Sequence, residues 1–138
     1  MVIERLRALL DPLDSADVEC DGMARLVCTV LSREQIGHSS FVGQLQLDGQ
    51  TVRPHFWVEV GPVLIDYRAR MWLGERDDVP HGVCLKSEIA AVYDGELYPI
   101  NPLPAHVFQL LALPRPEILM QQLGLASKEQ ARKPKGLS

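Results

Sequence analysis

A cysteine, a histidine and an aspartate occur in an order and a setting that suit acyl-transfer chemistry. Cys20 opens an apolar helical pattern, His55 lies on a predicted strand, and Asp66 lies on the strand predicted after it. In a Cys–His–Asp triad the thiol is the nucleophile and the imidazole takes its proton. The carboxylate fixes the imidazole tautomer and stabilises the charged ring. We therefore expect Cys20, His55 and Asp66 to form a catalytic site.

The spacing of His55 and Asp66 favours contact between them. Residues 51–60 alternate between two faces, residues 63–67 are rich in β-formers, and a Gly-Pro pair separates the two runs. In a hairpin closed directly across this break, His55 and Asp66 are diagonal neighbours, with Cβ atoms about 7 Å apart. One hydrogen bond spans that distance. The first strand is predicted to carry Val52, Pro54, Phe56, Val58 and Val60 on one face and Arg53, His55, Trp57 and Glu59 on the other.

Cys20 lies where the N-terminus of a buried helix is expected. Apolar residues recur after it at helical spacing, namely Met23, Leu26, Val27, Val30 and Leu31. Free backbone N–H groups and the helix dipole at such an end favour a thiolate and can donate to an oxyanion. The acidic neighbours Asp17, Glu19 and Asp21 oppose this, because negative charge raises the pKa of a thiol. The alternative interpretation of Cys20 is a small buried residue of the core.

Together these segments resemble the core of the transglutaminase-like superfamily, distant relatives of the papain-type cysteine proteases. The resemblance rests on Cys-Asp-Gly-Met-Ala-Arg-Leu-Val from Cys20, His-Phe-Trp-Val-Glu-Val from His55, and Val-Leu-Ile-Asp ending at Asp66, and it covers about residues 15–75. It implies that Cys20 attacks a peptide or protein amide, or an ester. Resemblance to the bacterial members favours a peptidase-like hydrolase, while transamidation stays open.

A second interpretation belongs to a different class of protein. Members of the family often have Gly directly before the Cys, whereas this chain has Glu19, and no Trp or Gln lies just upstream to supply an oxyanion donor. These departures favour a catalytically inactive transglutaminase-like domain that acts as a protein- or peptide-binding module.

The other cysteines and histidines suggest less specific roles. Cys28 lies two turns into the predicted helix and is expected in the core. His81 and Cys84 form a His-x-x-Cys pair, but a structural zinc site needs four ligands and no second pair has suitable spacing. We therefore expect no metal and no other cofactor. His38 suits a turn or a cleft, and His106 lies in an apolar run that favours a packed histidine.

Length and composition predict one modest domain. The chain has 138 residues, of which 46% are hydrophobic and 23% charged, and a chain of this size buries about two-thirds of its unfolded surface. A net charge of -4 gives no basic footprint for nucleic acid or an anionic membrane. The sequence has no long apolar run and no signal-peptide pattern, and its three cysteines form no regular frame. It therefore suggests a soluble, cytoplasmic protein.

We expect an α+β fold in which N-terminal helices, including the Cys20 helix, pack on an antiparallel sheet; the resemblance implies a transglutaminase-like or papain-like core. The predicted helices are 2–10, 20 to about 32–34, and 117–123, with 105–113 either a helix or a strand. The predicted hairpins turn at Asp48-Gly49, at Gly61-Pro62 and at Asp94-Gly95. Residues 1–126 are expected to form the domain and residues 127–138 a disordered tail.

Overall fold

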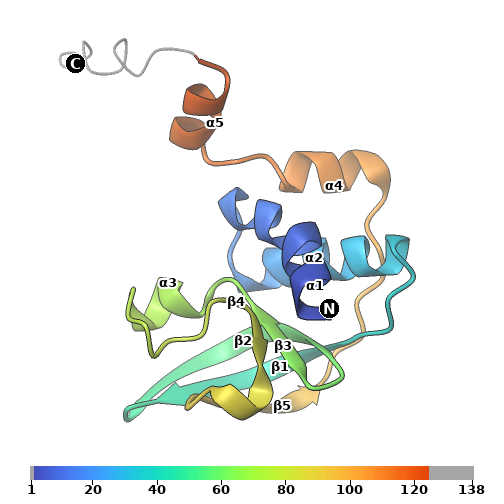
Figure 1. Ribbon diagram of the computed structural model, residues 1–138. Coiled ribbons are helices and arrows are strands. Elements are labelled where there is room, and N and C mark those ends of the chain that lie inside the picture. Colours follow the sequence, from blue (N-terminus) through green and yellow to red (C-terminus); the bar gives the residue numbers. More distant parts are fainter. Residues whose placement is uncertain (1, 125–138) are drawn as a thin grey trace, which may run out of the picture.

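Helices pack on an antiparallel sheet in the computed structural model, which describes residues 2–124 (Figure 1). The helical elements are α1 (Val2–Leu10), the 3₁₀ helix η1 (Asp11–Ser15), α2 (Cys20–Arg33), α3 (Ala69–Leu73), the 3₁₀ helix η2 (Lys86–Glu88), α4 (Ala105–Leu111) and α5 (Pro116–Gln122). The strands are β1 (Ser39–Leu47), β2 (Gln50–Val60), β3 (Val63–Asp66), β4 (Gly82–Leu85) and β5 (Val92–Leu97). The expected α+β class is confirmed at this level.

An apolar core joins the first two helices to the sheet, which lies below them in Figure 1. Its buried members include Leu6, Leu10, Met23, Leu26, Val27 and Leu31 from α1 and α2, and Val58, Val63 and Ile65 from β2 and β3. Fully burying one such side chain stabilises the fold by about 1.5–3 kcal/mol. This core holds the Cys20 helix against the strands that carry His55 and Asp66.

The five strands are all antiparallel to their neighbours, in the order β4-β3-β2-β1-β5. Two of the expected hairpins are confirmed. Between β1 and β2, Asp48 and Gly49 have φ values of 54° and 78°, as a type I′ turn requires. Between β2 and β3, Val60 pairs with Val63, which is the register that makes His55 and Asp66 diagonal neighbours.

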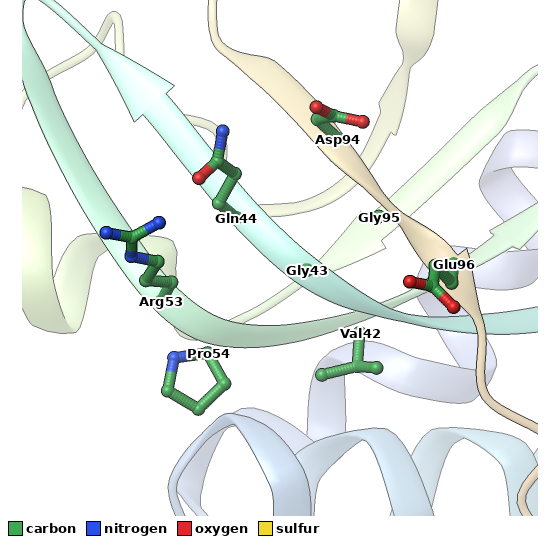
Figure 2. A pocket seen from close by; sticks show the side chains of 8 residues that line it. All are labelled: Val42, Gly43, Gln44, Arg53, Pro54, Asp94, Gly95 and Glu96. Carbon is green, nitrogen blue, oxygen red and sulfur yellow. The ribbon is translucent and has the colours of Figure 1, made fainter.

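A bulge in β2 alters the expected alternation. The pairing of β1 with β2 shifts so that Arg53 and Pro54 lie opposite Gln44 alone. Figure 2 shows these three residues together, with Gln44 on β1 and the other two on β2. The extra residue turns Val52 to the face of His55, where it packs against a second, smaller core cluster. The expectation that Val52 lies on the opposite face from His55 is therefore wrong, because a bulge breaks the period of two.

The third expected hairpin is also wrong, because Asp94 and Gly95 lie inside β5 rather than at a turn. Gly95 is paired with Gly43 of β1, and Figure 2 shows the two strands side by side there. A Cβ atom on Gly95 would lie only 2.8 Å from the ring of Trp57 and would also meet the β1 backbone. Glycine at this position permits close approach of two strands, and an Asp-Gly pair does not by itself distinguish this use from a turn.

Two short helices follow β5 at the end of the described chain. Residues 105–111 form α4, which settles the choice between helix and strand, and α5 begins with Pro116 at its first position. Gly124 follows α5 with a φ of 71°. The expected domain boundary at 126 and the expected tail, 127–138, lie outside the described residues. Within residues 2–124, no helix is both long enough and apolar enough to cross a membrane.

Candidate active site

His55 and Asp66 are joined by a short hydrogen bond in the interior of the protein. Nε2 of His55 lies 2.6 Å from Oδ2 of Asp66, and the two side chains are 0% and 1% exposed. The backbone pairing of β2 with β3 ends at Val58 and Ile65. Beyond that pair, the hydrogen bond between the His55 and Asp66 side chains joins the two strands. The contact expected from the hairpin register is confirmed.

Two further hydrogen bonds fix the carboxylate of Asp66. Its Oδ1 accepts a bond of 2.9 Å from the backbone N–H of Arg68, and its Oδ2 accepts one of 2.7 Å from the hydroxyl of Tyr93. The Tyr93 ring also lies beside the imidazole, with 6.2 Å between the ring centroids of Tyr93 and His55. Tyr93 was not among the expected site residues, because the sequence predicted a turn at Asp94-Gly95 rather than a single strand, β5, that passes beside β1.

The surroundings of His55 favour its charged form. Burial alone lowers the pKa of the imidazole, but the hydrogen bond to Asp66 and the neighbouring Cys20 thiol outweigh it and raise the pKa to about 9. Nε2 is occupied by Asp66, whereas Nδ1 is buried and has no hydrogen-bond partner among the residues that the structure describes. Nδ1 is therefore the ring nitrogen that remains available to a further partner.

Cys20 is the first residue of α2, as expected. Glu19 precedes the helix in an extended conformation, and no side chain caps this first turn. The N–H of Met23 makes a bond of 2.8 Å to the carbonyl of Glu19. The N–H groups before it, from Cys20 to Gly22, have no carbonyl one turn earlier within the helix. They form a partly positive end at which a thiolate or an oxyanion is stabilised.

A groove of about 580 Å³ opens beside Cys20. It is lined by Glu19, Cys20, Asp21, Gln50, Thr51, Val52, Arg53, Pro54, Phe56, Trp72 and Leu73. Cys20 is 9% exposed, while Trp72 is 51% exposed although it is large and apolar. The lining is mixed: the apolar residues alternate with Glu19, Asp21 and Arg53, and a concave space that combines apolar and polar groups is typical of a small-molecule or peptide site. The groove places such a space next to the thiol.

Arg53 and Pro54 line a second hollow on the other side of the bulge. This hollow has a volume of about 510 Å³ and includes Gly43 and Gly95, where β1 and β5 approach each other (Figure 2). Its charged residues are Arg53, Asp94 and Glu96, and no cysteine or histidine lines it. The hollow is therefore separate from the reactive groups around Cys20.

The other two cysteines lie away from this arrangement. Cys28 is fully buried in the core, as expected, and burial raises the pKa of its thiol to about 11. Burial also raises the pKa of Cys84. His81, three residues before Cys84, bonds through Nε2 to Asp14 at 3.0 Å. Among residues 2–124, no three His, Cys, Asp or Glu side chains are grouped so that they hold a metal ion.

The remaining histidines lie outside the site. Nδ1 of His38 is 2.8 Å from the carbonyl of Ile36, in the loop before β1, so His38 is a turn residue. His106 is exposed on α4, and the expectation of a packed histidine is wrong. The helical period turns Phe108 and Leu111 towards the core, while His106 points away from it.

Comparison with protein-family models, with curated proteins and with solved structures found no match for this chain.

Proposed function

We propose that this protein is a cysteine-dependent acyl-transfer enzyme of transglutaminase-like type, which hydrolyses a peptide or amide bond. One observation carries the proposal. His55 is buried with Nε2 bonded to Asp66 and Nδ1 unpaired, and the Cys20 thiol raises its pKa. An imidazole held in this way accepts the thiol proton on Nδ1, and Asp66 stabilises the resulting imidazolium.

The reaction follows from these positions. The thiolate of Cys20 attacks the carbonyl carbon, and the carbonyl electron pair moves to oxygen, where the free N–H groups of the first α2 turn stabilise the charge. As the tetrahedral intermediate collapses, His55 gives its Nδ1 proton to the departing amine, which leaves an acyl thioester on Cys20. Water attacks this thioester, His55 takes one water proton, and the acid and the Cys20 thiol are released. An amine in place of water gives transamidation.

The groove beside Cys20 is the place for the acyl group in this scheme. Val52, Pro54, Phe56 and Leu73 give it an apolar wall, and the exposed ring of Trp72 lies at the same surface. The apolar part of the wall can bury an acyl chain or a side chain, while Glu19, Asp21 and Arg53 supply charged groups in the same groove. We therefore propose a substrate with an apolar group next to the scissile carbonyl.

The second candidate is a binding module without turnover, and the charge around Cys20 favours it. Glu19 and Asp21 flank the thiol, are both exposed and line the same groove. Negative charge next to a thiol opposes loss of its proton. In this alternative the groove binds a peptide or protein segment, and Cys20 serves as a packing residue.

Alkylation by iodoacetamide separates the two candidates. The rate at pH 7 is measured at each cysteine by peptide mass spectrometry, so that Cys84 serves as a comparison within the same molecule. An activated Cys20 reacts at least about tenfold faster than Cys84, because the thiolate is the reactive form. The advantage is lost in His55→Gln, with circular dichroism to confirm folding. If Cys20 is alkylated no faster than Cys84, and its rate does not change in His55→Gln, the binding module is the better candidate.

Activity is then sought directly with panels of p-nitrophenyl esters and peptide amides. Cys20→Ser keeps a side chain of similar size and removes the thiolate, so turnover of any accepted substrate is expected to be lost. Turnover that persists in folded Cys20→Ser contradicts a Cys20 nucleophile.

A further inference from the structure

The guanidinium of Arg68 is buried and fully paired. Arg68 is 6% exposed and lies two residues after the end of β3. Its hydrogen bonds run from Nε to the carbonyl of Val18 (2.7 Å), from Nη1 to Oδ1 of Asp14 (2.8 Å) and the carbonyl of Tyr67 (2.8 Å), and from Nη2 to the carbonyls of Asp14 (3.0 Å) and Ala16 (2.8 Å). A guanidinium has five N–H donors. Each of them has an acceptor here.

These bonds connect the two parts of the candidate site. Residues 14–18 lead into α2, so the three carbonyls held there lie just before Cys20. At the same time the backbone N–H of Arg68 bonds to Oδ1 of Asp66. A single residue thus contacts both the approach to the nucleophile and the carboxylate that holds His55.

Such a link is needed because the two parts come from different segments of the chain. The β2–β3 hairpin sets the distance between His55 and Asp66, but it does not set the position of α2. Apolar packing between α2 and the sheet is strong but non-directional. Hydrogen bonds from a rigid, planar fork fix both distance and orientation.

We propose that Arg68 is a positioning residue for acyl transfer, which fixes the start of α2, and with it Cys20, relative to the His55–Asp66 pair. The inference rests on the proposed function. Arg68 touches none of the reacting atoms, because its donors are all occupied by residues 14–18 and by Tyr67.

The first test is Arg68→Lys, which keeps the charge but cannot serve five acceptors at once. The rate of Cys20 alkylation is measured against pH, together with circular dichroism and the midpoint of urea unfolding. We expect a folded variant in which Cys20 reacts about ten- to a hundredfold more slowly at pH 7, since small misplacements of reacting groups are costly. The pH dependence of the alkylation rate should differ from that of the wild type.

Arg70→Lys is the matched control. Arg70 also donates from Nε to a backbone carbonyl, that of Val79 at 3.0 Å, but makes no hydrogen bond to residues 14–18. It should lose stability without a change in the pH profile of Cys20. A merely structural role of Arg68 would make the two variants alike, with lower urea midpoints and unchanged profiles.

Asp14→Ala keeps the proposal testable if Arg68→Lys does not fold. It removes the one side-chain acceptor of the guanidinium and leaves the backbone acceptors in place. We expect alkylation of Cys20 to slow by about threefold or more. His81→Gln removes the other partner of Asp14 and should leave the rate unchanged.

The two proposals fail in different ways. If Cys20 of the wild type is alkylated no faster than Cys84, and its rate is the same in His55→Gln, the proposed function fails. If wild-type Cys20 is fast and His55-dependent, but folded Arg68→Lys gives the same pH profile as the wild type, the positioning role is overturned and the proposed function stands. If Asp14→Ala folds and Arg68→Lys does not, a pH profile of Cys20 alkylation in Asp14→Ala that is identical to that of the wild type overturns the positioning role of Arg68.

Discussion

The carboxylate of Asp66 holds the imidazole of His55 and is itself held in place by two other groups. Oδ2 receives both the imidazole of His55 and the hydroxyl of Tyr93, while Oδ1 is held by the backbone N–H of Arg68. A carboxylate held at both oxygens cannot rotate without breaking a bond. The His55 ring is therefore oriented by a group that is itself fixed, which is what a general base requires.

Asp66→Asn tests this orienting role. The amide keeps the shape of the carboxylate, but its NH₂ can favour the wrong tautomer of His55 and its oxygen cannot stabilise an imidazolium. In the serine triad this change lowers turnover by about 10⁴. A thiolate–imidazolium pair forms partly without the third member, so we expect a loss of roughly 10² to 10³ in the rate of Cys20 alkylation or acyl transfer.

Tyr93→Phe is the milder comparison for that experiment. It removes one donor to Asp66 and leaves the His55–Asp66 bond in place, so a loss of only a few-fold is expected. A folded Asp66→Asn protein whose alkylation profile overlays that of the wild type would remove Asp66 from the site and leave a Cys20–His55 pair.

The raised pKa of His55 predicts a pH dependence of stability. The pKa is 6.5 in the unfolded chain and about 9 in the fold, so the folded state binds the proton more tightly. The stabilisation is fully present below about pH 6.5 and is lost as the pH rises through about 9. We expect the free energy of unfolding in urea to fall by roughly 1–3 kcal/mol across this window.

Two variants show which histidine causes the pH dependence of stability. In His55→Gln, the free energy of unfolding should decline much less between pH 6.5 and 9. His81, whose pKa is also raised by a hydrogen bond to an aspartate, contributes with the same sign, so His81→Gln should remove only a smaller part. A wild-type stability that does not fall between pH 6.5 and 9 contradicts the raised pKa of His55.

At the scale of elements, local sequence signals predicted the turns and the helix that depend on residues close together in the chain. The Asp48-Gly49 turn, the break between β2 and β3 and the apolar stripe of α2 were all visible in the sequence, and the contact of His55 with Asp66 followed from them. The bulge in β2 and the course of β5 were not predictable in this way. The bulge breaks the period of two inside a local hairpin without a distinctive residue to mark it. The course of β5 depends on which strand pairs with the other edge of β1, and that is a long-range choice.

Gly95→Ala tests the close approach of β5 to β1. A Cβ there meets the ring of Trp57 and the backbone of Val42, so the strands must separate or the ring must move. We expect a loss of about 2–3 kcal/mol in the free energy of unfolding. Because Tyr93 belongs to the same strand and bonds to Asp66, alkylation of Cys20 should slow as well.

Gly37→Ala is the control for Gly95→Ala. A Cβ on Gly37 has nothing within 4 Å, and its backbone is not in the left-handed region. Its stability should stay within about 0.5 kcal/mol of the wild type. A Gly95→Ala protein as stable as Gly37→Ala would show that β5 can move away from β1 without cost.

At the scale of the whole molecule, the candidate site lies where the helical layer meets the sheet. Cys20 comes from α2, His55 from β2 and Asp66 from β3. Local sequence patterns predicted the element on which each of these residues lies, but no pattern indicated the side chains that join the elements. Arg68 and Tyr93 have ordinary neighbours in the sequence, and their contacts with residues 14–18 and with Asp66 arise only in the fold.

The groove is likewise assembled from several elements, and Trp72 of α3 tests its role. Iodoacetamide is small and needs only the thiolate, so Trp72→Ala should leave Cys20 alkylation unchanged. Turnover of esters or amides with an apolar acyl group should lose about tenfold in kcat/KM, since burying an aromatic contact is worth a few kcal/mol at most. Trp72 is 51% exposed, so the urea midpoint should barely change.

Met71→Ala is the matched control for that prediction. Met71 is the neighbour of Trp72 on α3 and is 46% exposed, but it lines a different hollow, near Asp14 and His81. It should therefore leave both alkylation and turnover unchanged. Equal losses of kcat/KM in the two variants would mean that α3 acts on the site through its overall position, whereas no loss in Trp72→Ala would place the acyl group outside this groove. A loss confined to Trp72→Ala, and growing with the size of the apolar acyl group, is the result that the groove requires.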